Sequence, residues 1–189
     1  MIEWLENIDR AIFLFFNQLH NPFMDEVMWV ITSKGFGIPF YALMLFLIVK
    51  KLEVRKAIFS IVLLAVTVGV ADLTARYGFK EVFMRYRPSQ NLDLYDQVHL
   101  VNDYRGGMYG FVSNHAANMF SLALAFYLLM KDELHRKALF FFPVAAIIAY
   151  SRVYLGVHYP SDIFVGALVG MSVAFLLNLI FNKFVENKL

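Results

Sequence analysis

The stretch SRVYLGVHYPSD, residues 151–162, joins two apolar runs, ALFFFPVAAIIAY at 138–150 and IFVGALVGMSVAFLLNLIF at 163–181. This pattern predicts a helix over 138–153, a short turn, and a last membrane crossing over about 161–182. The junction between the two helices gathers Arg152, His158 and Asp162. Charged side chains are costly inside the hydrocarbon and mark functional sites there, so charges between two apolar helices need an explanation.

The whole chain has the composition of a membrane protein. Its 189 residues are 60% hydrophobic and 17% charged, whereas soluble domains carry about 45–50% apolar and about 25% charged residues. We therefore expect an all-α, polytopic membrane helix bundle, a single domain over 1–189 with five or six transmembrane helices. The net charge of +2 predicts no nucleic-acid partner, and no obligate protein partner is indicated. The chain has no cysteine, which excludes disulfides, thiolate zinc sites and a cysteine nucleophile.

The remaining segments can be placed along the chain. Residues 1–20 have apolar positions at helical spacing and predict an amphipathic helix that lies in the membrane interface. Residues 23–49 predict a short helix, an interruption at 35–39 (GFGIP) and an apolar helix, as one kinked crossing or as a re-entrant pair with a crossing. Further crossings are expected over 57–79 and 111–130.

The only long loop expected, residues 89–110, suggests a lid or an opening over a site. It falls on the same side of the membrane as the turn at 152–161. Lys and Arg number eight on this side and nine on the other. If Lys80, Arg87 and Arg152 are present for catalysis, they do not count toward membrane orientation. The remaining Lys and Arg are then five on the side of the loop and nine on the other side, and the positive-inside rule places the loop outside the cytoplasm.

Two basic positions suggest an anion site. Only 14 residues separate Lys137 from Arg152, about 21 Å of helix, so Arg152 lies at or below the outer boundary of the hydrocarbon; snorkelling to the headgroups is the alternative. Lys80 and Arg87 are seven residues apart, so on a continuous helix ending at Pro88 they project from one face. Such a pair could bind a phosphate, or it could be a basic patch that touches anionic lipid.

Two further groups of polar residues start helices on the same side. Ser113 and Asn114 stand where the long loop becomes an apolar helix, with His115 in its first turn; this is an anion site or a simple helix cap. His158 precedes the last helix, and Asp162, four residues on, can accept the proton of one ring nitrogen. The other nitrogen is then a nucleophile or a base. Which nitrogen has which role stays open.

These three segments resemble the type-2 phosphatidic acid phosphatase and vanadium haloperoxidase superfamily, whose pattern is K-x6-R-P, then P-S-G-H, then S-R-x5-H-x3-D. The chain has KEVFMRYRP at 80–88, VSNH at 112–115 and SRVYLGVHYPSD at 151–162. The first and third segments match at every defining position. In the second, Val112 replaces Pro and Asn114 replaces Gly, which puts the shape of that part of the pocket in question.

The resemblance implies a metal-independent membrane lipid phosphatase without a cofactor. It implies that His158 attacks phosphorus and forms a phosphohistidine, that Asp162 orients His158, and that His115 protonates the leaving oxygen. The residues implied to hold the phosphoryl oxygens are Lys80, Arg87, Ser113, Asn114 and Arg152. Three cations and a helix N-terminus can neutralise the phosphoryl oxygens without a metal ion.

The expected substrate is a lipid phosphate from the membrane. Short members of the family suggest undecaprenyl diphosphate, on the extracytoplasmic face of a bacterial cytoplasmic (inner) membrane. The alternatives are phosphatidylglycerol-phosphate, phosphatidate and lipid A. Arg85, Arg105 and His99 either hold a second phosphate or are solvated loop charges. An alternative of another class is a transporter with a path through Asp72, Arg76 and Arg152, in which Asp72 and Arg76 form a pair.

Overall fold

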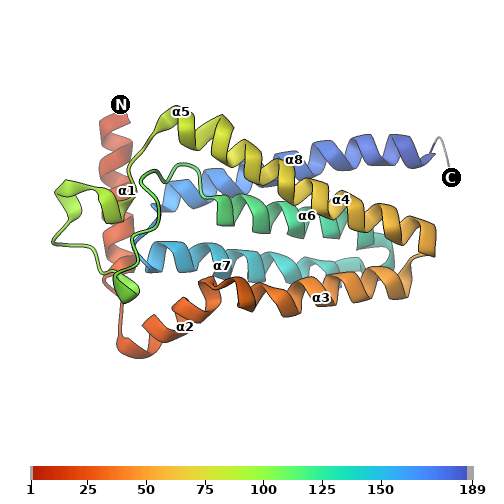
Figure 1. The fold of residues 1–189 in the computed structure, drawn as a ribbon, viewed down its shortest axis with the longest axis horizontal. Helices are drawn as coiled ribbons and strands as arrows, with labels where there is room; N and C mark the ends of the chain where they lie inside the picture. Colours follow the sequence, from red (N-terminus) through yellow and green to blue (C-terminus); the bar gives the residue numbers. More distant parts are fainter. Residues whose placement is uncertain (1, 187–189) are drawn as a thin grey trace.

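A computed structural model describes residues 2–186 of the chain. Its long helices run back and forth along one axis, while the first helix crosses one end of the bundle (Figure 1). The described residues form no strand; an isolated bridge joins Tyr86 to Tyr109. The helices are α1 (Ile2–Asn17), α2 (Pro22–Thr32), α3 (Lys34–Lys51), α4 (Val54–Leu73), α5 (Glu81–Phe83), α6 (Asn114–Leu134), α7 (Phe141–Tyr154) and α8 (Pro160–Glu186).

Three stretches are long and apolar enough to cross a membrane: Val54–Phe83, Asn114–Tyr154 and Pro160–Lys183. The pair α2 and α3, bent by 47°, is a fourth if it forms one span. The stretch Asn114–Tyr154 contains α6 and α7, which turn back on each other, so that Phe126 and Phe141 stack edge to face at 4.8 Å (Figure 1). The all-α membrane bundle is confirmed, and the expected count of five or six crossings depends on how these two folded stretches are counted.

The break between α2 and α3 lies earlier than the GFGIP stretch suggests. It falls at Ser33, whose hydroxyl caps the N-terminus of α3 by accepting from the Phe36 amide. Pro39 lies inside α3, in its second turn. The serine cap therefore decides where the helix restarts.

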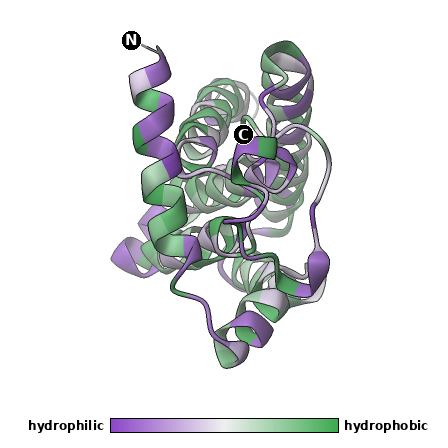
Figure 2. Cartoon of the chain, turned by 90° about the vertical axis from the view of Figure 1, so that its left-hand side faces the viewer, coloured by the Kyte–Doolittle hydropathy of each residue, from purple (hydrophilic) through white to green (hydrophobic). Residues whose placement is uncertain are grey.

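Helix α8 packs closely on α6, and both helices begin at the end of the bundle that carries α1 (Figure 1). Two glycines of α8 make this possible, because a Cβ on Gly166 would lie 2.7 Å from the Ser113 carbonyl and a Cβ on Gly170 would overlap the Ala117 carbonyl. The core along α3, α4, α6, α7 and α8 contains Met44, Leu64, Phe126, Phe141 and Ala174 among others. Figure 2 looks onto the end that carries α1, where hydrophilic segments of α1 and of the loops lie among hydrophobic ones.

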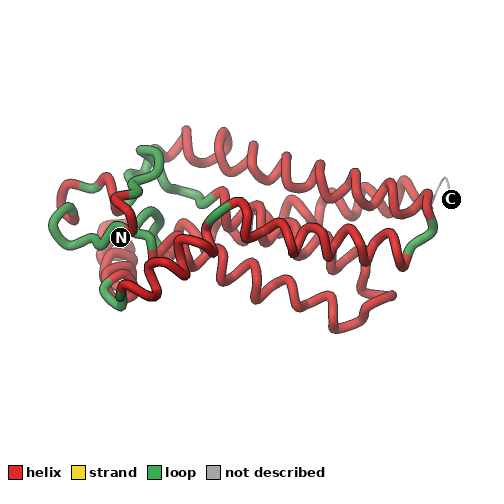
Figure 3. The backbone as a smooth tube through the Cα atoms, turned by 60° about the horizontal axis from the view of Figure 1, so that its bottom comes forward, coloured by secondary structure: helices red, strands yellow, loops and turns green. Residues whose placement is uncertain are grey.

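The loops at this end bring distant segments together. The chain from Met84 to Ser113 contains three short 3-10 turns, at Pro88–Gln90, Leu92–Leu94 and Val101–Asp103, and lies beside α1 (Figure 3). The turn between α7 and α8 is at the same end, while the turn between α3 and α4 lies at the other (Figure 1). The sidedness inferred from the sequence, with the long loop beside the 152–161 turn, is therefore the arrangement of the fold.

Candidate active site

The sequence suggests one continuous helix from Lys80 to Arg87. The structure instead breaks this segment. The end of α4 continues as a π-helical turn, Thr74–Lys80, and α5 ends at Met84, whose φ of 45° is left-handed. Residues after Met84 are extended and pair with the end of the long loop: the Arg87 amide donates to the Met108 carbonyl and the Gly110 amide to the Arg85 carbonyl. Lys80 therefore comes from a helix end and Arg87 from a paired loop.

His158 and Asp162 form the pair expected from their spacing. The Nδ1 atom of His158 lies 3.1 Å from Oδ2 of Asp162, and the same oxygen accepts from the Tyr159 amide at 3.0 Å. His158 as a whole is 1% exposed. Gly110 makes room for this pair, because a Cβ there would lie 2.9 Å from the Asp162 carboxylate.

Arg87 settles the question of the two ring nitrogens. Its Nη1 lies 3.1 Å from Nε2 of His158, while Nη1 also donates to the Val157 carbonyl and Nε to the Tyr109 carbonyl. A guanidinium can only donate, so Nε2 is the acceptor and Nδ1 carries the proton toward Asp162. The structure thus leaves Nε2 of His158 unprotonated, with its electron pair directed at the Arg87 guanidinium.

The charges around His158 favour its neutral form. Burial, followed by the positive charges of Arg87, Arg152 and Lys80, holds the pKa of His158 well below its ordinary value; His115 acts in the same direction. Burial, followed by Arg152, lowers the pKa of Arg87 to about 10, so this side chain stays charged at neutral pH. The three sequence segments therefore converge on one neutral imidazole surrounded by cations.

The start of α6 is built as expected, with one addition at Asn114. Ser113 caps the helix by accepting from the Ala116 amide. Asn114, which stands where the family pattern has Gly, accepts from Nζ of Lys80 at 2.6 Å and donates to the Asp72 carboxylate at 2.9 Å. The Asn114 side chain therefore holds Lys80 in place, which neither its capping role nor the family pattern indicated.

Arg152 lies at the end of α7 with its guanidinium inside the protein, so it does not snorkel outward. Nη1 donates to the Thr32 hydroxyl at 2.6 Å and Nη2 to the Tyr104 hydroxyl at 3.3 Å, while Nε is buried without a hydrogen-bond partner among the described residues. Thr32 and His115 line the same small cavity, of about 160 Å³. Through its hydrogen bond to Thr32, Arg152 therefore contacts a wall of the cavity that His115 lines.

Arg85 has a role that the sequence analysis missed. It was expected either to hold a second phosphate or to be a solvated loop charge, but it lies between two carboxylates, with Nη1 3.1 Å from Asp162 and Nη2 2.7 Å from Asp9. Arg105 donates to the Ser89 carbonyl, and His99 contacts Asp25. The sequence signal for Arg85 was weak, since Asp9 lies 76 residues away in the expected interfacial helix.

Asp72 and Arg76 do not form the pair that the transporter alternative expects. Asp72 accepts from Asn114 and Asn118, and Arg76 pairs with Glu81 rather than with Asp72. The reason is the π-helical turn that begins at Thr74, because it shifts Arg76 away from the position four residues on that a regular helix would give. Asp72 is instead linked to Lys80 through the Asn114 side chain, which hydrogen-bonds to both.

One group in the described part of the chain has the composition of a metal site. His20, Asp25 and His99 place one ligand atom each within 4.8 Å of one another. The rings of His20 and His99 stack in parallel at 3.7 Å, and His99 Nε2 contacts Asp25 Oδ2 at 2.9 Å. This group joins the end of α1 to α2 and the long loop, and includes none of the residues expected to bind phosphate.

Comparison with known proteins gives a consistent set of relatives. Two lipid A 4'-phosphatases are similar, from Bacteroides thetaiotaomicron (37% identical over 171 residues, 90% of this chain and 75% of the relative) and Porphyromonas gingivalis (33% over 172 residues, 91% and 72%). YbjG of Escherichia coli, whose name proposes undecaprenyl-diphosphatase activity, is 30% identical over 174 residues, 88% of this chain and 79% of the relative.

The fold has a solved counterpart as well. A transmembrane PAP2-type phosphatidylglycerolphosphate phosphatase from Bacillus subtilis superposes with a TM-score of 0.71 at 23% identity, over 95% of this chain and 87% of that one. The model of the PAP2 superfamily matches residues 53–186, which include all three motif segments. The chain therefore belongs to the PAP2 superfamily and is an integral-membrane lipid phosphatase.

Proposed function

We propose that this protein hydrolyses a phosphate ester of a phosphorylated glycolipid of the lipid A type and releases phosphate. The observation that carries the chemistry is the neutral, buried His158, whose Nε2 electron pair faces a cationic pocket. The choice of substrate rests on the relatives: the two lipid A 4'-phosphatases are 37% and 33% identical, against 30% for YbjG. They support the lipid A alternative better than the undecaprenyl diphosphate expected from the sequence.

We propose a two-step reaction for these groups, with the roles that the family resemblance implies. Nε2 of His158 attacks phosphorus, a P–N bond forms, and the bond from phosphorus to the ester oxygen breaks; His115 gives that oxygen its proton. Water then attacks the phosphohistidine, gives a proton to His115, and releases phosphate and free His158. Lys80, Arg87, Arg152, Ser113 and the Asn114 amide hold the phosphoryl oxygens, and Asp162 keeps the Nδ1 proton in place.

The cavities support a substrate that reaches the site from the bilayer. An apolar cavity of about 460 Å³ is lined by residues of α3, α4 and α6. It shares Tyr41, Asn118 and Met119 with the smaller cavity that is lined by His115. This juxtaposition suits a molecule with a hydrocarbon tail and a phosphorylated head, because the two parts require neighbouring apolar and polar sites.

The decisive experiment measures phosphate release from a panel of lipid phosphates by purified protein in detergent with EDTA. The panel contains lipid A, undecaprenyl diphosphate, phosphatidylglycerol-phosphate and phosphatidate, with vanadate as inhibitor and His158→Ala as the control variant. We expect the highest kcat/KM for lipid A, activity in EDTA, and inhibition by vanadate. If wild type and His158→Ala release phosphate equally from every substrate, the proposed reaction is wrong; a preference for undecaprenyl diphosphate would reject only the choice of substrate.

We also propose that the site faces outward from a bacterial inner membrane. The support is the excess of basic residues at the opposite end once Lys80, Arg87 and Arg152 are assigned to chemistry. Because the chain has no cysteine, a single introduced cysteine reports on which side of the membrane its residue lies. In intact cells, Leu92→Cys in the long loop, 86% exposed, should react with an impermeant maleimide, and Asp132→Cys at the end of α6 should not. The reverse result would reject this orientation.

A further inference from the structure

Asp9 on α1 is a nearly buried carboxylate in an otherwise amphipathic helix. It is 7% exposed and meets three donors: Nη2 of Arg85 at 2.7 Å, the backbone amide of Ser161 at 2.9 Å, and the Ser161 hydroxyl. The superfamily match begins at residue 53, so α1 lies outside it. A residue outside the matched region therefore contacts the N-terminus of α8, the helix that starts with the His158–Asp162 turn.

Arg85 extends this contact to the reactive pair. Its Nη1 donates to Oδ1 of Asp162 at 3.1 Å and to the Ser161 hydroxyl at 2.7 Å, and its guanidinium stacks 4.1 Å from the centre of the Tyr159 ring. Oδ2 of Asp162 is used by His158 and the Tyr159 amide. Arg85 thus binds the carboxylate oxygen that His158 does not, and so fixes the rotation of the carboxylate.

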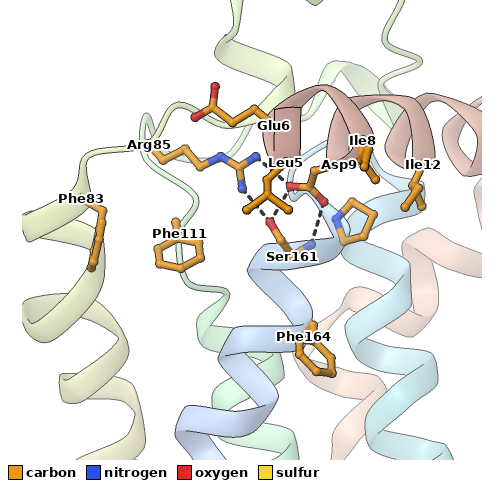
Figure 4. A pocket seen from close by; sticks show the side chains of 11 residues that line it. Leu5, Glu6, Ile8, Asp9, Ile12, Phe83, Arg85, Phe111, Ser161 and Phe164 are labelled. Atoms are coloured by element: carbon orange, nitrogen blue, oxygen red, sulfur yellow. Dashed lines mark hydrogen bonds and ion pairs between the residues drawn. The ribbon is translucent and has the colours of Figure 1, made fainter. Parts of the chain in front are cut away.

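The surroundings of this network are apolar. A groove of about 670 Å³ runs between α1 and α8, and its walls include Leu5, Ile8 and Ile12 of α1 and Phe164 of α8. Asp9, Arg85 and Ser161 lie together in its interior and point toward one another (Figure 4). An ion pair with apolar walls is screened less than one in water, so its geometry is maintained more strongly.

We propose that Asp9 and Arg85 are positioning residues for the reaction, and that α1 is a working part of the active site. Asp9 holds Arg85, Arg85 holds Asp162, and Asp162 orients the His158 imidazole for attack on phosphorus. Neither Asp9 nor Arg85 binds the phosphoryl group in this arrangement. The inference rests on the proposed roles of His158 and Asp162.

The test separates kcat from KM for Asp9→Asn, Arg85→Gln, the double variant and Asp9→Glu, with lipid phosphate in mixed micelles. A misplacement of a reacting group by about 1 Å can cost about 10²-fold in rate. We therefore expect kcat to fall by roughly 10-fold to 100-fold in each single variant, with KM within about twofold. The double variant should be no worse than the poorer single, because both act through one contact chain. Asp9→Glu should recover part of kcat.

The matched control is Arg10→Gln on the same helix, which breaks the exposed Arg10–Asp93 pair and should leave kcat unchanged. Thermal unfolding in detergent identifies any variant that fails to fold. If Asp9→Asn is among them, the kcat of Asp9→Glu is compared with that of wild type instead. Wild-type kcat in folded Asp9→Asn, or an equal loss in Arg10→Gln, would overturn the inference. If His158→Ala is as active as wild type, the proposed reaction fails first; if only His158→Ala is inactive and Asp9→Asn is normal, the positioning role alone is wrong.

Discussion

The two ends of the helix bundle differ in what their buried side chains contact. Toward the turns that join α3 to α4 and α6 to α7, most of the interior is apolar, with Ile48, Phe126 and Met130 fully buried. At the end that carries α1, the buried groups include Arg87, His158 and Asp162, each of which has a polar partner. The apolar end is therefore held together mainly by packing, and the end that carries α1 by contacts between charged and polar groups. Substitutions should affect stability at the apolar end and turnover at the end that carries α1.

The largest expected effect is at the polar end. His158→Ala removes the proposed nucleophile, and kcat for lipid phosphate should fall by about 10³-fold or more, as happens when a covalent nucleophile is deleted. The midpoint of thermal unfolding in detergent should change far less, because Asp162 keeps Arg85 and the Tyr159 amide as partners and Arg87 keeps its two carbonyl acceptors. A fall in stability that matches the loss of activity would contradict the division between the two ends.

Asn114→Gly tests the departure from the family pattern. It restores the residue of the pattern but removes the link between Lys80 and Asp72, and a hydrogen bond to a charged group contributes about 1.5–3 kcal/mol. We expect kcat/KM to fall by roughly 10-fold to 100-fold. Asn118→Ala, which breaks the other contact of Asp72, should have a smaller effect because Lys80 keeps its partner. An Asn114→Gly variant with full activity would mean that Lys80 needs no support.

Gly170→Ala tests the packing of α8 on α6. The added Cβ would overlap the Ala117 carbonyl, and overpacking typically costs about 1–3 kcal/mol. The unfolding temperature should therefore fall while kcat per folded molecule stays near wild type. Gly69→Ala on α4 is the control, since a Cβ there meets nothing within 4 Å. Equal unfolding temperatures for the two variants would show that the helices can separate without loss.

The smallest expected effect is the pH dependence of stability caused by His158. Its pKa is well below the ordinary value in the folded protein, whereas the unfolded imidazole binds a proton near pH 6.5. The unfolded state thus gains a proton as the pH falls below about 6.5, and stability is lost by up to about 1.4 kcal/mol per pH unit. Unfolding temperatures measured from pH 7 to pH 5 should fall more steeply for wild type than for His158→Gln. Parallel slopes would mean that His158 is not held neutral.

Much of the site could be predicted because its residues lie in three short segments. Spacing alone placed His158 beside Asp162 and Ser113 at the start of a helix, and both contacts are present. Spacing failed for Lys80 and Arg87, because a π-helical turn and the left-handed Met84 break the helix between them. Local sequence rules do not reveal such a break when pairing with residues 108–110 is what stabilises the extended segment.

Sequence by itself determined the membrane bundle, the family and the polar end of the helices, because composition, apolar run length and motif spacing are local properties of the chain. Tertiary structure alone decided which nitrogen of His158 is unprotonated, what Asn114 does in place of glycine, and that Asp9 reaches Arg85. Each of these depends on a contact between residues at least 34 positions apart. Such contacts form only when the helices pack, since packing is what brings the charged groups out of water and within hydrogen-bond distance of one another.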